Sequence, residues 1–444
     1  MNSRWLDYLP GFLHRRLSGR HELQSVLGNS GWLFADKALR MGGGLLMMVF
    51  IARYLGPAGF GQLSYALAFV ALFGAITTMG LDGLVVRELV RAPQQTDEIL
   101  GSALGLRLIG STVSVLAAIL AVRLLRPADV QEQMLVAIIA VGMLFQVVDI
   151  VDLWFQSRVA SRFTVMARNA AFLAMLLVRV ALILTRADVA AFAWAASAEL
   201  ALAAAALAWS FHRQGRTWAA LRPRLTRMRA LFAESWWLLV AGLAVLVYMR
   251  IDQVMLAAFL GEREVGLYAA AVRLSEMWYV IPMVLVSSVS PSLTEARARS
   301  EELYYQRLQS LFNLLARVAY GVAIAMSLGA GLLMRTLYGE SYAGAGLVLA
   351  IHAWTAVFLF VGVAYSPWIL NEGHAHYQMW QTLLGAALNV LLNCWLIPRY
   401  GIVGCAIAAV AAQAVAMWLG NALFAPTRRI FRMQTLALLG GLWR

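Results

Sequence analysis

Long uninterrupted apolar runs constrain this chain more than any other feature of its sequence. Segments such as Leu116–Ala121 and Leu173–Val178 contain no polar residue. Hydrophobic residues make up 61% and charged residues only 13% of the 444 residues, whereas a soluble domain carries about 25% charged residues. These runs also lack the polar–apolar alternation of a membrane β-barrel. The sequence therefore predicts an all-α polytopic membrane protein and excludes a water-soluble enzyme, a disordered protein and a coiled coil.

We predict about twelve membrane-spanning helices, because a helix needs about 20 apolar residues to cross a bilayer. The spans lie near residues 29–52, 60–86, 98–122, 133–155, 164–185, 189–211, 236–260, 265–291, 308–334, 345–369, 377–397 and 402–424. The longest connection is basic and divides them into six plus six. The resulting units are a cytoplasmic amphipathic segment 1–28, a six-helix lobe 29–212, a basic linker 213–235, a second six-helix lobe 236–425 and a basic amphipathic tail 426–444.

Basic residues predict the orientation of the chain in the membrane. The formal net charge is +13, and in a membrane protein Lys and Arg collect in cytoplasmic loops. With the N-terminus inside, 22 of the 36 basic residues fall in segments on the side of the two termini, and seven fall in segments on the other side. We therefore expect both termini in the cytoplasm, and we expect no nucleic-acid partner.

The two predicted lobes share a glycine pattern where their first two spans meet. Gly56 and Gly61 match Gly261 and Gly266 at a single offset of 205 residues. Glycine at such a place supplies unusual backbone angles or a close helix contact. The recurrence predicts two pseudo-equivalent halves that face each other across a central cleft, which is a common plan for transporters.

These residues resemble a known family. The segment Arg53–Gly61, the segment Gly80–Glu88 and the second-half Gly261/Gly266 hairpin are similar to oligosaccharide flippases of polysaccharide biosynthesis (Wzx type). Those proteins belong to the multidrug/oligosaccharidyl-lipid/polysaccharide exporter superfamily. The resemblance implies two six-helix lobes, alternating access and no enzymatic activity.

The resemblance also implies a substrate and a place. It implies that the chain moves an undecaprenyl-diphosphate-linked oligosaccharide from the cytoplasmic to the outer leaflet of the bacterial inner membrane, for O-antigen, capsule or exopolysaccharide assembly. The implied partners are this lipid-linked substrate, membrane lipids, and a polysaccharide polymerase with its chain-length machinery.

Charged residues inside the predicted spans mark the candidate substrate site, because each costs at least about 2.5 kcal/mol to insert. Four of the seven basic ones lie in the first, seventh and eighth spans, which line the central cleft in the resembling family. Arginine binds phosphate through two parallel hydrogen bonds and stays charged. We expect Arg40, Arg250 and Arg273 to contact the diphosphate, with Lys37 as an additional point charge. Pairing with nearby carboxylates is an equally open role for any one of them.

Four acidic residues inside or near the spans raise the question of coupling. Asp36, Glu199, Asp252 and Glu276 are candidates either to carry H⁺ or bind Na⁺, or to form ion pairs. Asp36 and Arg40 are spaced i,i+4, and Arg273 and Glu276 are spaced i,i+3, so each pair shares a helical face. We expect no cofactor beyond such a coupling ion.

The sequence leaves other functions open but gives each less support. Asp149 and Asp152 form a DxxD motif that suits Mg²⁺ in a prenyl-phosphate glycan transferase or polymerase; a polar cluster between helices is the simpler interpretation, and we expect no resident metal. An ion-coupled drug or metabolite antiporter of the same superfamily is the nearer alternative. Such an antiporter for organic cations should present acidic cleft residues without a cationic cluster.

Overall fold

The computed structural model describes residues 21–372 and 375–440, with side chains for residues 40–369, 372 and 376–440. Every regular element in these ranges is a helix, which confirms the predicted fold class. Most of the predicted N-terminal segment 1–28, the side chains of Asp36 and Lys37, and the last four residues of the tail lie outside the described residues.

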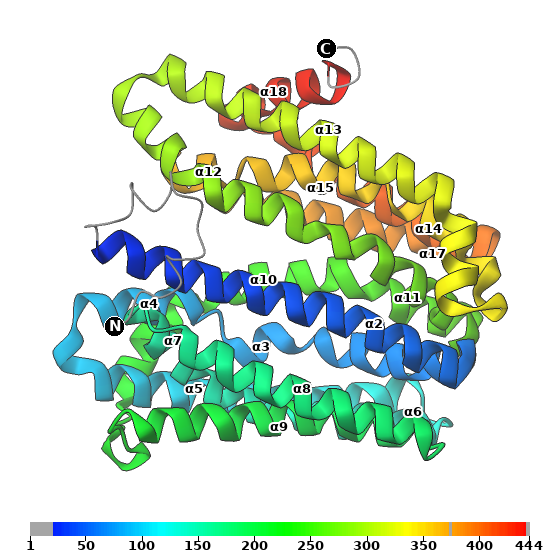
Figure 1. Cartoon of the computed structure of the whole chain (residues 1–444), viewed down its shortest axis with the longest axis horizontal. Coiled ribbons are helices and arrows are strands. Elements are labelled where there is room, and N and C mark those ends of the chain that lie inside the picture. The colour runs from blue at the N-terminus through cyan, green and yellow to red at the C-terminus, as the bar shows by residue number, and fades with distance from the viewer. Residues whose placement is uncertain (1–20, 373–374, 441–444) are drawn as a thin grey trace.

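The helices form two lobes, and the long helices run roughly along the long axis of the molecule (Figure 1). The N-lobe contains α2 (His21–Ala71), α3 (Gly74–Thr78), α4 (Asp82–Arg91), α5 (Thr96–Leu125), α6 (Val130–Gly142), α7 (Ile150–Ser157), α8 (Arg162–Leu184) and α9 (Val189–Arg213). The C-lobe contains α10 (Leu225–Leu260), α11 (Glu262–Glu276), α12 (Val280–Arg299), α13 (Glu301–Leu333), α14 (Gly346–His352), α15 (Thr355–Ala364), α16 (Ser366–Glu372), α17 (Ala375–Met417) and α18 (Arg428–Gly440).

Length and composition identify nine membrane-spanning candidates among the described helices, or ten if the bent pair Glu340–His352 and Thr355–Ile369 is one span. Two of the nine, Arg40–Ala71 and His376–Ala422, each join parts of two predicted spans. The backbone leaves helical geometry at Gly56 in α2 and at Gly401 in α17, both with positive φ (68° and 57°). Splitting these two helices at their glycines turns ten candidates into the twelve expected crossings. The chain is therefore a multi-pass membrane protein.

Tight turns close the end of the molecule at which α10 meets α11, which we call the hairpin end. The backbone angles φ/ψ are 68°/175° at Gly56 and 87°/178° at Gly261. Residues with a Cβ avoid this region. Gly339 and Gly401 also have positive φ at connections between spans. A single glycine thus reverses the chain between two long helices.

The lobes meet at the hairpin end through a reciprocal backbone contact between α2 and α11. A Cβ on Gly61 would lie 1.7 Å from the carbonyl oxygen of Glu262, and a Cβ on Gly266 would lie 1.9 Å from the carbonyl oxygen of Pro57. Pro57 and Glu262 are separated by the same 205 positions as the two glycines. The internal repeat is therefore a structural one, with a pseudo-twofold axis between Gly61 and Gly266.

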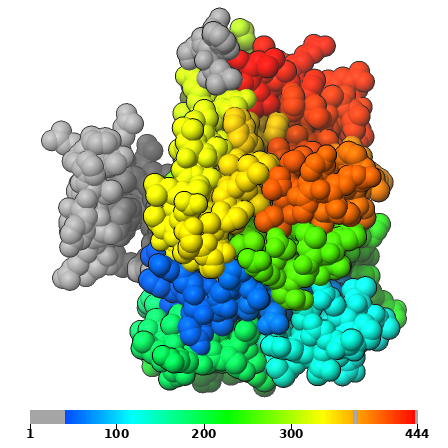
Figure 2. Space-filling view, turned by 90° about the vertical axis from the view of Figure 1, so that its right-hand side faces the viewer, coloured from blue at the N-terminus to red at the C-terminus, as the bar shows by residue number. Residues whose placement is uncertain are grey.

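A hydrophobic core surrounds this contact and belongs to both lobes. Ile51 and Phe60 of α2 pack in one cluster with Ala270 of α11 and with Ala345 and Leu349 near α14. The Tyr342 hydroxyl also donates a hydrogen bond to the Ala52 carbonyl across the lobes, at 2.9 Å. Figure 2 looks onto the hairpin end and shows blue N-lobe residues directly against yellow and light green C-lobe residues. The two lobes are joined at this end.

The linker and the tail are both packed on protein. Arg224 and Arg227, near the start of α10, form ion pairs with Glu98 (3.1 Å) and Glu88 (2.7 Å) of the N-lobe. The tail forms α18, whose apolar face packs on the C-lobe core around α13. The Tyr320 hydroxyl donates to the carbonyl of Leu438 there, at 3.1 Å.

We expect Gly61→Ala to open the hairpin end, because its Cβ has no room beside the Glu262 carbonyl. Alanine favours helix over glycine, so the effect cannot come from helix propensity. Spin labels at Leu184→Cys and Tyr400→Cys, in a Cys394→Ser background, should report a longer distance between the lobes. Gly44→Ala, whose Cβ meets nothing within 4 Å, is the matched control. An unchanged distance in Gly61→Ala would show that the contact does not hold the lobes together.

Candidate functional site

Two arginines and one glutamate form a cluster inside the membrane part of the C-lobe. Arg250 of α10 lies 3.7 Å from the carboxylate of Glu276 of α11, and their side chains are 31% and 21% exposed. The guanidinium of Arg273 lies over the ring of Phe60, 5.6 Å from its centroid. Since Phe60 belongs to α2, Arg273 faces the N-lobe. We call Arg250, Arg273 and Glu276 the C-lobe basic cluster.

The C-lobe basic cluster carries one positive charge more than its carboxylate can balance. Glu276 forms an ion pair with Arg250. Among the described contacts, no carboxylate lies within ion-pair distance of Arg273. The i,i+3 pairing of Arg273 with Glu276 that the sequence suggested is thus replaced by a contact between helices. An uncompensated cation in the membrane is expensive, so this cluster suits an anionic ligand.

A polar cavity of about 380 Å³ lies in the N-lobe, where α2, α8, α9 and the short helix η3 (Met143–Asp149) meet. We call it the N-lobe cavity. Its lining residues are Arg40, Phe145, Gln146, Asp149, Arg168, Glu199, Leu200 and Ala203. Its charged groups balance one another, because two arginines face two carboxylates.

Arg40 reaches this cavity and shares Glu199 with a second arginine. One Glu199 oxygen lies 3.6 Å from Arg40, and the other accepts a 2.7 Å hydrogen bond from Arg179. The Arg40 side chain is 36% exposed, whereas Arg179 is 10% exposed. Arg179 therefore serves as the buried partner that fixes Glu199, and Arg40 remains accessible to a ligand. The sequence had no signal for this triad because its members lie on three different helices.

The DxxD carboxylates are held by an arginine that the sequence analysis did not single out. Arg168 of α8 lies 2.9 Å from Asp149 and 3.3 Å from Asp152. The Gln156 amide donates a further hydrogen bond to Asp152 at 3.1 Å. The arrangement is that of a polar cluster joining α7 and α8.

Asp252 lies apart from both arginine groups. Its carboxylate is buried and accepts hydrogen bonds from the Tyr268 hydroxyl and the Asn393 amide, each at 2.7 Å. Within the described side chains, it forms no ion pair with an arginine. Among the candidate acids whose side chains are described, Glu199 and Glu276 are paired with arginine and Asp252 is not.

The structure brings some of the predicted site residues together and separates others. Arg250, Arg273 and Glu276 form one group, and Arg40 and Glu199 form another in the opposite lobe. No described contact joins Arg40 to Arg250 or to Arg273. Lys37 and Asp36 lie outside the described side chains. The four hairpin glycines occupy the turns and the reciprocal contact at the hairpin end.

Comparison with known proteins identifies the family. A family model described as "Polysaccharide biosynthesis protein" matches residues 26–297. The chain belongs to this family. The family match confirms the resemblance to the Wzx-type flippases seen in the sequence.

A curated relative of this polysaccharide biosynthesis protein is the probable low-salt glycan biosynthesis flippase Agl15 of Haloferax volcanii. The two are 23% identical over 202 residues, which cover 44% of this chain. The match spans about two fifths (41%) of the relative's own length.

Solved structures of two transporters share the fold. The inward-facing conformation of a multidrug resistance MATE family transporter of the MOP superfamily has a TM-score of 0.73 at 13% identity, covering 89% of this chain and 95% of that one. The lipid II flippase MurJ in an inward closed conformation has a TM-score of 0.63 at 12% identity, covering 94% and 92%. These likenesses show that the chain has the fold of these transporters.

We expect Glu199→Gln to destabilise the protein strongly. The substitution leaves Arg179 buried without its counter-charge, which costs about 3 kcal/mol. The thermal unfolding temperature of the purified protein in detergent measures the effect. Glu295→Gln removes the partner of Arg299 from a pair in which both side chains are more than half exposed, and it should change little. Equal unfolding temperatures for the two variants would contradict a structural role for the Arg40–Glu199–Arg179 triad.

Proposed function

We propose that this protein carries a lipid-linked oligosaccharide across the membrane by alternating access. Membership of the polysaccharide biosynthesis family and similarity to a named glycan flippase support the substrate class. The C-lobe basic cluster carries the proposal: its unbalanced positive charge, inside the membrane and facing the other lobe, is the complement of a diphosphate.

The diphosphate binds at Arg250 and Arg273 in this proposal. Arginine keeps its charge in a low-dielectric environment and offers paired donors to phosphate oxygens. Glu276 holds Arg250 in place from one side, and the Phe60 ring supports the Arg273 guanidinium from another. Lys37 remains a proposed additional charge on α2.

Arg40 and the N-lobe cavity take the sugar side of the head group. The cavity offers a guanidinium, carboxylates and the Gln146 amide around one space, so it supplies both donors and acceptors to hydroxyl groups. Its positive and negative charges balance, so it attracts an anion less strongly than the C-lobe basic cluster does. The lipid tail stays in the bilayer while the head group passes between the lobes.

The joined hairpin end defines one of the two states that alternating access requires. The charge count of the loops places the hairpin end on the outer side, so the described arrangement corresponds to a carrier closed to the outside. We place the protein in the bacterial inner membrane with both termini in the cytoplasm, as the resemblance implies. A polymerase and its chain-length machinery would receive the exported O-antigen, capsule or exopolysaccharide unit.

Coupling to H⁺ or Na⁺ forms part of the proposal. Asp252 suits this role best among the candidate acids whose side chains are described, because hydroxyl and amide groups surround it and no arginine compensates its charge.

The single variants Arg40→Ala, Arg250→Ala and Arg273→Ala should each reduce surface polysaccharide by about tenfold or more. The reason is that a hydrogen bond to a charged group contributes about 1.5–3 kcal/mol. The corresponding Lys variants keep the charge but lose the paired donors, and they should retain part of the export. Surface polymer and membrane abundance of the protein are measured together. Arg299→Ala is the control, because its exposed side chain pairs with Glu295 on its own helix. Full export by the triple Ala variant would reject the site.

A further inference from the structure

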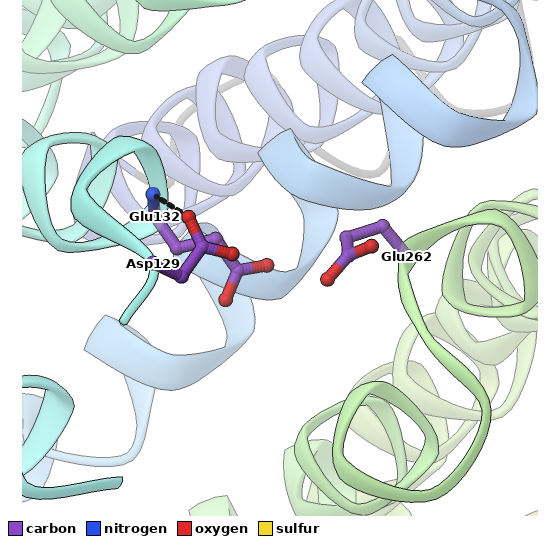
Figure 3. A group of neighbouring side chains, drawn as sticks. All are labelled: Asp129, Glu132 and Glu262. Carbon is purple, nitrogen blue, oxygen red and sulfur yellow. Dashed lines mark hydrogen bonds between the residues drawn. The ribbon is translucent and has the colours of Figure 1, made fainter. Parts of the chain in front are cut away.

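Three carboxylates converge at the hairpin end, and they come from both lobes (Figure 3). Asp129 and Glu132 lie at the start of α6 in the N-lobe, and Glu262 is the first residue of α11 in the C-lobe. One oxygen of each lies within 4.8 Å of the other two. We call Asp129, Glu132 and Glu262 the hairpin-end acidic cluster.

The local fold positions each member of this cluster. Asp129 caps α6, and one of its carboxylate oxygens accepts a 3.0 Å hydrogen bond from the backbone NH of Glu132. Glu262 follows Gly261, and its own carbonyl packs on Gly61. Its side chain therefore reaches Glu132 only where the two lobes are joined.

Glu132 is the member that requires an explanation. Its side chain is fully buried, and neither carboxylate oxygen has a hydrogen-bond partner among the described residues. A buried carboxylate without donors is costly unless a cation or a proton compensates it. The Glu132 carboxylate lies with those of Asp129 and Glu262 around one shared space.

One arginine is present and does not balance the charge. Arg126 lies 3.1 Å from Glu262 and 3.5 Å from Glu132, and its guanidinium lies over the ring of Tyr65. Three carboxylates and one guanidinium leave a net charge of −2. A single divalent cation brings the group to neutrality, whereas a proton or a sodium ion would leave it negative.

The ligand set distinguishes between divalent cations. Ca²⁺ accepts flexible coordination by several carboxylates, at about 2.3–2.6 Å from each oxygen. Mg²⁺ requires a near-ideal octahedron at about 2.0–2.1 Å and is usually bound through one or two carboxylates and several waters, so three carboxylates from two lobes suit Ca²⁺ better. Asp129 and Glu262 are partly exposed, which gives an ion and its waters access from the side that the hairpin end faces.

We propose that Asp129, Glu132 and Glu262 bind a calcium-sized divalent cation that ties the two lobes together at the hairpin end. The site draws ligands from both lobes, so the ion stabilises the arrangement with this end closed. This proposal does not depend on the transported substrate, because the binding is a property of the purified protein.

The test measures the thermal unfolding temperature and Ca²⁺ binding by calorimetry, using purified protein in detergent at constant pH and ionic strength. Ca²⁺ should raise the unfolding temperature of the wild type in a saturable manner, and Mg²⁺ should act more weakly. Glu132→Gln keeps the side-chain shape and should weaken Ca²⁺ binding by about tenfold or more, the scale at which even outer-shell partners affect metal affinity. Glu340→Gln, an exposed acid near the same end, should bind Ca²⁺ as the wild type does.

Arg126→Gln separates this proposal from a simple ion pair between the lobes. If a cation binds, removing the competing guanidinium should tighten Ca²⁺ binding. If the arginine alone holds the lobes, the variant should be destabilised and should not respond to Ca²⁺. Absence of any Ca²⁺ effect in the wild type, an unchanged response in Glu132→Gln, or stabilisation by acid in place of Ca²⁺ would each overturn the proposal.

Discussion

The close backbone contact between Gly61 and Gly266 sets the arrangement of the rest of the molecule. Each glycine lies against a carbonyl oxygen of the other lobe, at a distance that no side chain permits. Once the backbones of α2 and α11 approach this closely, neighbouring groups are brought within reach as well. The hydrogen bond from Tyr342 to Ala52 and the ion pair of Arg126 with Glu262 both cross the lobes beside this contact. Small residues are the general means by which membrane helices approach one another.

Charge balance divides the membrane part into groups of different character. The Arg40–Glu199–Arg179 triad lies next to Arg168 with its two aspartates, so positive and negative groups in this part of the N-lobe are equal in number. The C-lobe basic cluster keeps an excess of one positive charge, and the Asp252 carboxyl has only neutral hydrogen-bond partners. Unbalanced charge is costly away from water. Binding of an ion or an anionic head group is therefore most favourable in free energy at these groups.

Most of the architecture could be predicted from the sequence, because spans and turns are local features. Apolar length gave the number of crossings, and glycine spacing gave the two turns and the repeat. The positions of the helix breaks inside predicted spans were not accessible: α3 ends before, and α4 begins after, a left-handed Gly80 that packs on the backbone of α10. That requirement depends on a partner 155 residues away, at Ser235.

The partners of the charged residues could not be predicted for the same reason. Spacing along one helix suggested that Arg273 pairs with Glu276, but a helix neighbour brings Arg250 to that glutamate instead. No spacing in the sequence links Glu132 with Glu262, and only the joining of the lobes makes them neighbours. Local periodicity assigns a residue to a face of its helix, whereas the choice of partner depends on packing between helices.

The helix α10 limits how the lobes can move relative to each other. It is continuous from Leu225 to Leu260, packs on α3 and α5 of the N-lobe in its first part, and packs on α17 of the C-lobe. Separation of the hairpin end must therefore bend α10 or release its first part from the N-lobe. This part is held by the close contact of Gly80 with Ser235 and by Leu231 in an N-lobe apolar cluster, whereas its partly exposed ion pairs, such as Arg224 with Glu98, contribute little. The glycine contact and its apolar core resist separation at the hairpin end, and any relative movement of the lobes must overcome both contacts.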